Sequence, residues 1–232
     1  MKKNLFLLVF IWFTTNSSAQ LHELGLSFGR SNYAGDIGPT ALINPNSGSF
    51  GVIYKYIKNP RTSYRISLSS MGIVANDSDS KNEIRRDFDL GIDKKITELT
   101  AGIDFNFLEY KISHWKRAHT PYLIFEFVAF HYKKAIGTKD DFSYNSKIGV
   151  ALPFGAGYKV QISDSFVIAF EVKLRYSFTD DLDDSQFYKD EFLNDNPENS
   201  KFGNTKSKDW YTFAGFTVTY TFGRTLFYTT RR

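Results

Sequence analysis

The segment WYTFAGFTVTYTFGR, residues 210–224, is the strongest evidence in the sequence for the fold. With few exceptions, every second residue is apolar, and these residues form one face: Trp210, Ala214, Phe216, Val218, Tyr220 and Phe222. The other face carries the small residues Gly215, Thr217, Thr219 and Thr221. A period of two indicates a β-strand. In a soluble sandwich the second face would be charged and hydrated, whereas here it is small and hydroxylic. Because aromatic residues end the apolar row on both sides, the segment predicts a strand that crosses a lipid bilayer.

Seven further segments alternate in the same way: residues 23–29, 50–56, 64–69, 98–107, 123–129, 150–161 and 166–178. The predicted connections are short at 58–61 and 163–164, moderate at 109–120, and long at 31–49, 73–95, 134–147 and 180–209. Turns on the periplasmic side of outer-membrane barrels are short and outer loops are long. We therefore predict an all-β fold, an eight-stranded antiparallel transmembrane β-barrel of the up-and-down type. Pro153 cannot donate a ladder hydrogen bond and predicts a bulge. A soluble barrel or sandwich is the alternative.

The first residues predict export. Lys2 and Lys3 precede an apolar run from Leu5 to Phe13 and a small-residue approach to Ala19, which is typical of a signal peptide over residues 1–19. The barrel then comprises residues 20–232. The chain has no cysteine, which suits a bacterial envelope protein without disulfides. Without the two N-terminal lysines, 27 basic residues face 25 acidic ones, a net charge of +2, so nucleic acid is not an expected partner. We expect the outer membrane, both termini periplasmic, and outer-membrane lipids around the barrel.

Charged residues on the inward faces predict what fills the barrel. Eight strands leave an interior that side chains can fill, so no wide channel is expected. Buried charges need partners of opposite sign. We therefore predict a polar plug of salt bridges inside the barrel; a narrow ion path or a catalytic site is the alternative. Its members are Arg65, Glu98, Asp104, Glu126, Lys159, Glu171, Lys173 and Arg175.

Motifs for chemistry are scarce. The sequence has no Gly-x-Ser-x-Gly elbow and no His-Glu-x-x-His helix, and its four histidines are His22, His114, His119 and His131. The pairing of His131 with Glu126 is the one arrangement that resembles an acid–base pair. We expect no enzyme, no cofactor and no metal centre. The acidic run at 180–184 is expected to be a solvated loop, with calcium binding as the alternative, because its spacing matches no EF-hand.

Basic residues gather at the end where the short turns are predicted. They are Lys58, Arg61, Lys111, Lys116, Arg117 and Arg224. A positive patch attracts acidic proteins, so this end is a candidate face for a periplasmic partner. Scattered solubilising charge is the alternative.

Six stretches together resemble a known family: HELGLSFGRSNYAGDIGPT (22–40), FGVIYKY (50–56), ITELTAGIDFNF (96–107), TPY (120–122), RYSFTDDLDD (175–184) and DWYTFAGFTVTYTFGR (209–224). They are similar to the PorG-like outer-membrane proteins of the type IX secretion system of Bacteroidetes. The resemblance implies a non-enzymatic barrel that associates with a periplasmic ring of the PorK lipoprotein and PorN, and that supports protein export and, where present, gliding motility. It implies no catalytic or ligand residues.

Two other functions remain open at this stage. One is a general structural or adhesion barrel of the outer membrane whose long loops bind. The other is a hydrolase or acyltransferase with a site at the barrel rim, for which His131 is the candidate residue.

Overall fold

The computed structural model describes residues 21–35, 37–39, 41, 44–81, 83, 86, 91–112, 117–138, 141–179, 182 and 209–223. The signal peptide predicted for residues 1–19 lies outside this part of the chain, so it and the domain boundary at residue 20 stay predictions. Within the described residues, no helix has the length and apolarity to cross a membrane.

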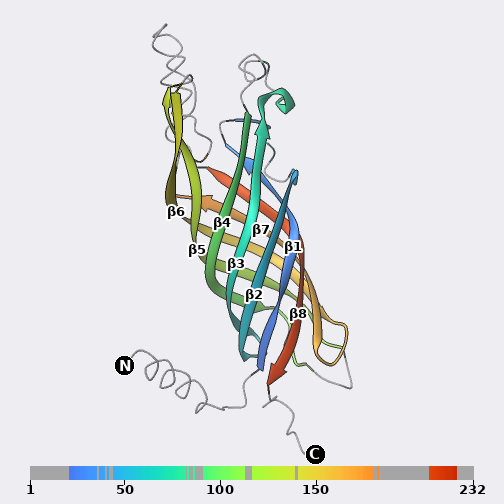
Figure 1. Ribbon diagram of the computed structural model, residues 1–232. Coiled ribbons are helices and arrows are strands. Elements are labelled where there is room, and N and C mark those ends of the chain that lie inside the picture. The colour runs from blue at the N-terminus through green and yellow to red at the C-terminus, as the bar shows by residue number, and fades with distance from the viewer. Residues whose placement is uncertain are drawn as a thin grey trace, which may run out of the picture.

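Eight antiparallel strands form one closed barrel in which each strand pairs with its neighbours in sequence and β1 pairs with β8 (Figure 1). The strands are β1 (Leu21–Ala34), β2 (Ser47–Asn59), β3 (Thr62–Asn76), β4 (Gly91–Asn106), β5 (His119–Thr138), β6 (Asp141–Gln161), β7 (Phe166–Ser177) and β8 (Trp210–Gly223). A single turn of 3-10 helix (Asp77–Asp79) follows β3. The predicted eight-stranded antiparallel barrel is confirmed. Closure pairs the backbone of every strand, which a bilayer requires because it offers no water to an unpaired edge.

The outer wall is apolar. Neighbouring residues of β1 to β4 form what we call the aliphatic row: Leu26, Val52, Leu68 and Leu99, which pair in that order. All four side chains are 45–56% exposed. A contiguous apolar surface of this kind is unusual on a soluble monomer and normal on a barrel that faces lipid chains. The wall therefore carries the surface of a membrane-spanning barrel.

Aromatic residues lie on the outer wall on both sides of this apolar zone. At the end that carries the 60–61 turn, which we call the short-turn end, His22 stacks on Tyr54 and Phe222 and its Nδ1 lies 2.7 Å from the Tyr54 hydroxyl. At the opposite, long-loop end, Trp210 packs on Phe154 and Tyr176. Amphipathic rings favour the two membrane interfaces, so these clusters mark the height of the bilayer on the barrel.

Glycines on the inner face make room for charged side chains on adjacent strands. Gly102 lies between Arg65 and Glu126 in the ladders, and a Cβ there would be 2.2 Å from the Phe125 carbonyl oxygen. Gly155 lies opposite Lys173, and its Cβ would be 3.0 Å from Lys173 Cγ. Since a side chain at either position would collide with its neighbours, the narrow barrel depends on glycine beside its buried charges.

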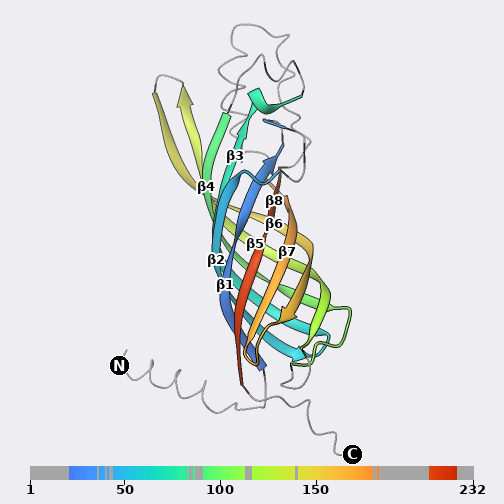
Figure 2. The ribbon, with the colours of Figure 1, turned by 90° about the vertical axis from the view of Figure 1, so that its right-hand side faces the viewer.

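One predicted connection is wrong. Residues 134–147, expected to be a long loop, instead extend β5 and β6, which join through residues 139–140. Beyond His131, β5 no longer pairs with β4, and before Ala151, β6 does not pair with β7. The two strands therefore rise above the barrel as a hairpin that pairs only with itself (Figure 2). Alternation failed as a signal here because residues 143–148 of β6 are all exposed, so successive side chains do not face different environments.

The bulge predicted at Pro153 is also wrong. Glu126 and Phe127 of β5 have no ladder partner beside Pro153, yet Phe125 pairs with Phe154 and Val128 with Ala151. Pairing thus resumes in the same register without an extra residue. The missing amide of proline interrupts the ladder locally and leaves the alternation of faces intact.

Candidate functional site

The barrel interior has three zones along its axis. An apolar cluster fills the long-loop end and includes Tyr33, Ile96, Phe130 and Tyr211. A second apolar cluster closes the short-turn end, where Tyr110 and Ile112 of the 107–112 segment fold inward against strand residues. Charged side chains occupy the zone between them. The polar zone is consequently separated from water at both ends by packed apolar side chains.

Arg65 is the centre of the polar zone. Its Nη1 lies 2.8 Å from Asp104 Oδ1, its Nε 2.8 Å from Glu126 Oε1, and its Nη2 3.0 Å from Glu171 Oε2. The four side chains come from β3, β4, β5 and β7, so this one guanidinium links strands on different sides of the barrel. All four are buried. A planar guanidinium suits this place because its donors point in fixed, separate directions.

Two lysines complete the charge balance around Arg65. Lys55 Nζ lies 2.9 Å from Asp104 Oδ2, and Lys173 Nζ lies 3.4 Å from Glu126 Oε2. Glu171 receives further contacts from both lysines, at 3.6 and 3.5 Å. The Tyr122 hydroxyl donates to Glu171 Oε1 at 2.5 Å. Each carboxylate is therefore shared by at least two donors, as buried charges require.

Other charges lie nearer the two ends. Arg175 Nη2 lies 3.1 Å from Glu98 Oε2. Lys159 Nζ lies over the rings of Tyr110 and Tyr122, at 4.4 and 5.1 Å from their centres. The face of an aromatic ring attracts a cation, more strongly when water is excluded. Lys159 is thus held by ring faces, and it joins the polar zone to the apolar cluster of the short-turn end.

The structure buries all eight residues predicted for the interior: Arg65, Glu98, Asp104, Glu126, Lys159, Glu171, Lys173 and Arg175. It adds two that sequence reasoning missed, Lys55 and Glu23, which gives five buried cations and five buried anions within the eight strands as the structure describes them. Both alternate with outward residues, Lys55 between Tyr54 and Tyr56 and Glu23 between His22 and Leu24. Strict application of the period of two would have placed them inside.

The acid–base pair considered for His131 does not form. His131 lies on the outer wall and is exposed, whereas Glu126 points into the barrel and contacts Arg65 and Lys173. An odd and an even residue of the same strand point to opposite faces. The part of the chain that the structure describes also holds no group of three or more His, Asp or Glu side chains arranged to bind a metal ion. The rim site therefore loses its candidate residue.

Of the basic residues predicted for the short-turn end, four are described by the structure and exposed (Lys58, Arg61, Lys111 and Arg117), and two of these four form ion pairs. Lys111 Nζ lies 2.7 Å from Glu109 Oε2. The hydrogen bond from Lys111 and its charge hold the pKa of the Glu109 carboxyl below its ordinary value. Arg117 lies 3.5 Å from Asp164. These two acids weaken the positive patch that the sequence predicted.

Lys58 and Arg61 are different. Lys58 donates to the Tyr64 hydroxyl at 3.3 Å and Arg61 to the Phe107 carbonyl at 2.7 Å, and within the described ranges neither forms a salt bridge. The charge of Arg61 nevertheless contributes to the lowered pKa of the Glu109 carboxyl. Lys58 lies near the end of β2 and Arg61 in the 60–61 turn, and both are exposed. Lys116 and Arg224, predicted for the same face, lie outside the described residues, as does most of the acidic run at 180–184.

A family comparison matches nearly the whole chain. The profile described as "Domain of unknown function (DUF6089)" matches residues 2–231. The chain belongs to the DUF6089 family. A search of curated proteins found no match to this DUF6089 chain.

Solved structures similar to the DUF6089 chain include outer-membrane proteins. Ail, the attachment invasion locus protein of Yersinia pestis, is 16% identical with a TM-score of 0.47, covering 88% of this chain and 100% of Ail. Neisserial surface protein A is 13% identical with a TM-score of 0.44, covering 88% and 98%. A major outer-membrane protein of Thermus thermophilus is 12% identical with a TM-score of 0.46, covering 88% and 100%.

Proposed function

We propose that this protein is a non-enzymatic barrel of the outer membrane that supports type IX secretion by docking a periplasmic lipoprotein ring of the PorK and PorN kind. The observation that carries the proposal is the short-turn end, where Lys58 and Arg61 are exposed and form no salt bridge with the described residues. The resemblance of the sequence to PorG-like proteins supplies the partner. In gliding relatives the same complex supports motility.

The membrane location follows from the outer wall and from the predicted signal peptide. Exposed aliphatic side chains such as Val52 and Leu68 suit a lipid bilayer, and barrels of this kind belong to the outer membrane. The start of β1 pairs with the end of β8, Leu21 with Gly223, so the first residue of β1 and the last residue of β8 both lie at the short-turn end. We place that end in the periplasm, because short turns face the periplasm and long loops face outside.

The filled interior favours docking over transport. Apolar clusters at both ends and ion pairs around Arg65 fill the interior of the barrel with side chains that contact one another. A barrel with such an interior acts through its surfaces. Of these, the short-turn end carries the positive charge of Lys58 and Arg61, which attracts an acidic partner and steers its approach.

The experiment reverses charge at the β2–β3 turn. In the native host, a tagged Lys58→Glu/Arg61→Glu variant is compared with the unchanged protein by co-purification in mild detergent and by secretion of proteins that carry a sorting domain. We expect the ring to be lost from the purified complex and secretion to fall severalfold. The matched control, Lys133→Glu/Lys147→Glu, makes the same charge change on the exposed β5–β6 hairpin at the other end. Normal ring recovery with the turn variant, or equal loss with the control, would refute docking at this face.

A second candidate, a structural or adhesion barrel, has one specific observation in its favour. The β5–β6 hairpin rises beyond its neighbours and exposes Tyr144 (61%) and Ile148 (78%). Apolar residues on a protruding element mark a contact surface. Tyr144→Ser/Ile148→Ser should reduce attachment of whole cells to host or mineral surfaces if this function is correct, and leave ring co-purification unchanged. Attachment at the wild-type level would remove the support for this candidate.

A further inference from the structure

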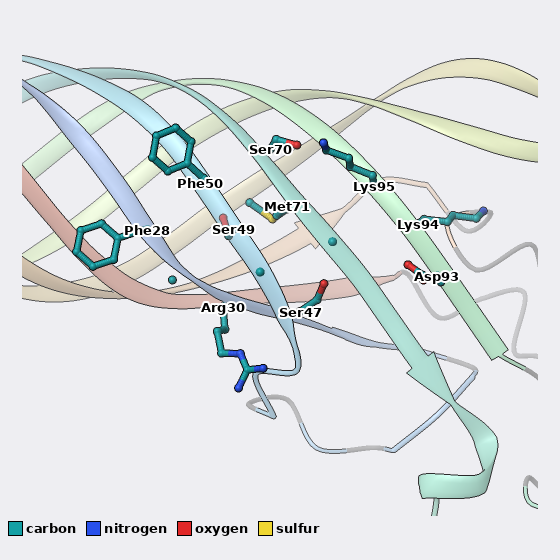
Figure 3. Close-up of a pocket in the computed structure, with 13 residues that line it drawn as sticks. Phe28, Arg30, Ser47, Ser49, Phe50, Ser70, Met71, Asp93, Lys94 and Lys95 are labelled. Atoms are coloured by element: carbon teal, nitrogen blue, oxygen red, sulfur yellow. The ribbon is translucent and has the colours of Figure 1, made fainter.

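A groove of about 840 Å³ opens on the barrel wall near the long-loop end. Its lining comes from four consecutive strands, β1 to β4 (Figure 3). The part nearest the middle of the barrel is aromatic: Phe28 pairs with Phe50, and both side chains are exposed, at 47% and 55%. They lie two residues beyond the aliphatic row on their strands, so the groove continues the lipid-facing surface. A ligand that binds at this part of the groove therefore needs an apolar portion.

Two residues farther toward the long-loop end, the outward residues are cations and glycines. Arg30 pairs with Gly48, and Gly72 pairs with Lys95. The pair Ser49–Met71 is the last of the β2–β3 ladder, which places Gly48 and Gly72 at the same height, one residue beyond it. The outward order across the four strands is therefore cation, glycine, glycine, cation. Arg30 pairs with Ala214 and Ala34 with Trp210, so this level lies four residues nearer the middle of the barrel than the Trp210 cluster. Long cationic side chains at such a depth extend along the wall and bring their charges to the interface.

Gly48 leaves space between the two cations, whereas the Cβ position of Gly72 lies 1.9 Å from Ser47 Oγ and is already occupied. A Cβ at Gly48 would meet no heavy atom within 4 Å, so the position is open. Strands lie about 4.8 Å apart, which puts the backbones of Arg30 and Lys95 roughly 14 Å apart across three spacings. Both side chains are long enough to lean over the gap. A single small anion reaches one of them, whereas a broad headgroup with two anionic groups reaches both.

The charge of the groove is positive. Arg30 and Lys95 line its outward side together with a single acid, Asp93, whereas Lys94 alternates to the inner face of β4 and its Nζ is buried. Asp93 lies two residues beyond Lys95 on β4, at the margin farthest from the aliphatic row. The order from the middle of the barrel outward is thus aliphatic, aromatic, cationic and acidic, which matches an amphiphile with acyl chains inward and an anionic headgroup at the interface.

We infer that this groove binds a phosphorylated glycolipid of the outer leaflet, with its acyl chains along Phe28 and Phe50 and its phosphates at Arg30 and Lys95. Guanidinium and ammonium groups bind phosphate through charge-assisted hydrogen bonds. The inference rests on the outer-membrane location and orientation proposed above and does not depend on ring docking.

The test is native mass spectrometry of the full-length protein in detergent, titrated with a bis-phosphorylated lipid A and, separately, with the same lipid after removal of its phosphates. We expect the phosphorylated lipid to be retained and the dephosphorylated one to be bound at least tenfold more weakly. Arg30→Ala/Lys95→Ala should weaken retention on the order of tenfold, because each interfacial cation contributes to the attraction of an anionic lipid. Lys133→Ala/Lys147→Ala, on the exposed hairpin, is the matched control and should change nothing.

A steric variant keeps the charges. Gly48→Phe places a ring in the open space without a backbone clash and should weaken retention as much as the loss of both cations. Equal binding of both lipids, or retention unchanged by the cation pair or by Gly48→Phe, would overturn the inference. All variants keep Lys58 and Arg61, so ring co-purification from the same cells reports on the proposed function separately. Folding is checked by heat-modifiable electrophoretic migration.

Discussion

Replacing Arg65 by methionine should be among the most destabilising single changes in the barrel. The guanidinium contacts Asp104, Glu126 and Glu171 at 2.8–3.0 Å, and all of these groups are buried. Methionine fills much of the volume but leaves four buried cations facing five buried anions within the strands as described. Removing one partner of a buried ion pair costs about 3–5 kcal/mol, because the remaining charge stays out of water. We expect the free energy of unfolding of Arg65→Met to fall by that amount.

Unfolding in urea, followed by intrinsic fluorescence and by heat-modifiable migration in lipid vesicles, measures this change. Arg65→Lys keeps the charge but places all its donors on one nitrogen, so it cannot reach the three carboxylates in separate directions, and it should cost about 1–3 kcal/mol. Adding Glu171→Gln to Arg65→Met restores the balance of charge and should recover part of the loss, a coupling of about 1–3 kcal/mol. Lys133→Met on the exposed hairpin should stay within about 0.5 kcal/mol of the unchanged protein. An Arg65→Met protein as stable as the original, or a double variant less stable than the single one, would refute the charge-balance reasoning.

Three other predictions concern the wall, the seam and the short-turn end. Phe216→Arg places a charge in the lipid-facing wall and should cost about 2–4 kcal/mol of unfolding free energy in vesicles, and a loss under about 1 kcal/mol would contradict a bilayer location. Thr219→Ser keeps the hydroxyl that donates to Glu23 at 3.1 Å and should cost little, whereas Thr219→Val should cost about 1–3 kcal/mol in the same assay; equal losses would show that the hydrogen bond is unimportant. Lys111→Met should raise the pKa of Glu109 toward the ordinary glutamate value in an NMR titration, because the contact with Lys111 favours the carboxylate. In the unchanged protein the Glu109–Lys111 ion pair is present above the ordinary glutamate pKa and is lost as the pH falls through the depressed pKa of Glu109. An unchanged pKa would show that the pair is absent in solution.

Much of the barrel follows from the sequence because a strand with two different faces has a fixed period. In β7, the charged residues Glu171, Lys173 and Arg175 alternate with outward apolar residues, and the structure buries all three. The strand number and the antiparallel order were predictable for the same reason. Lys55 follows the same rule, because it lies between the outward Tyr54 and Tyr56 and a strict period of two predicts its inward position.

Other features depend on contacts that no local pattern encodes. Tyr110 and Ile112 lie in a connection rather than a strand, and they are buried because the 107–112 segment turns into the barrel opening. The upper parts of β5 and β6 pair with each other above the barrel, where residues 143–148 are all exposed and no alternation is required. The neutralisation of Lys111 and Arg117 by Glu109 and Asp164 likewise requires knowledge of the folded surface.

The seam between the first and last strands has a consequence for how the chain is made. β1 and β8 are held together by the ladder from Leu21–Gly223 to Ala34–Trp210 and by side-chain hydrogen bonds of Glu23 with Thr219 and of Asn32 with Thr212. These partners are 196 and 180 residues apart in sequence. Contacts of such separation form late, after most of the loop-closure entropy has been lost. Until β8 pairs with β1, the edge of β1 is open, so whatever assists insertion into the membrane must shield that edge until the last strand arrives.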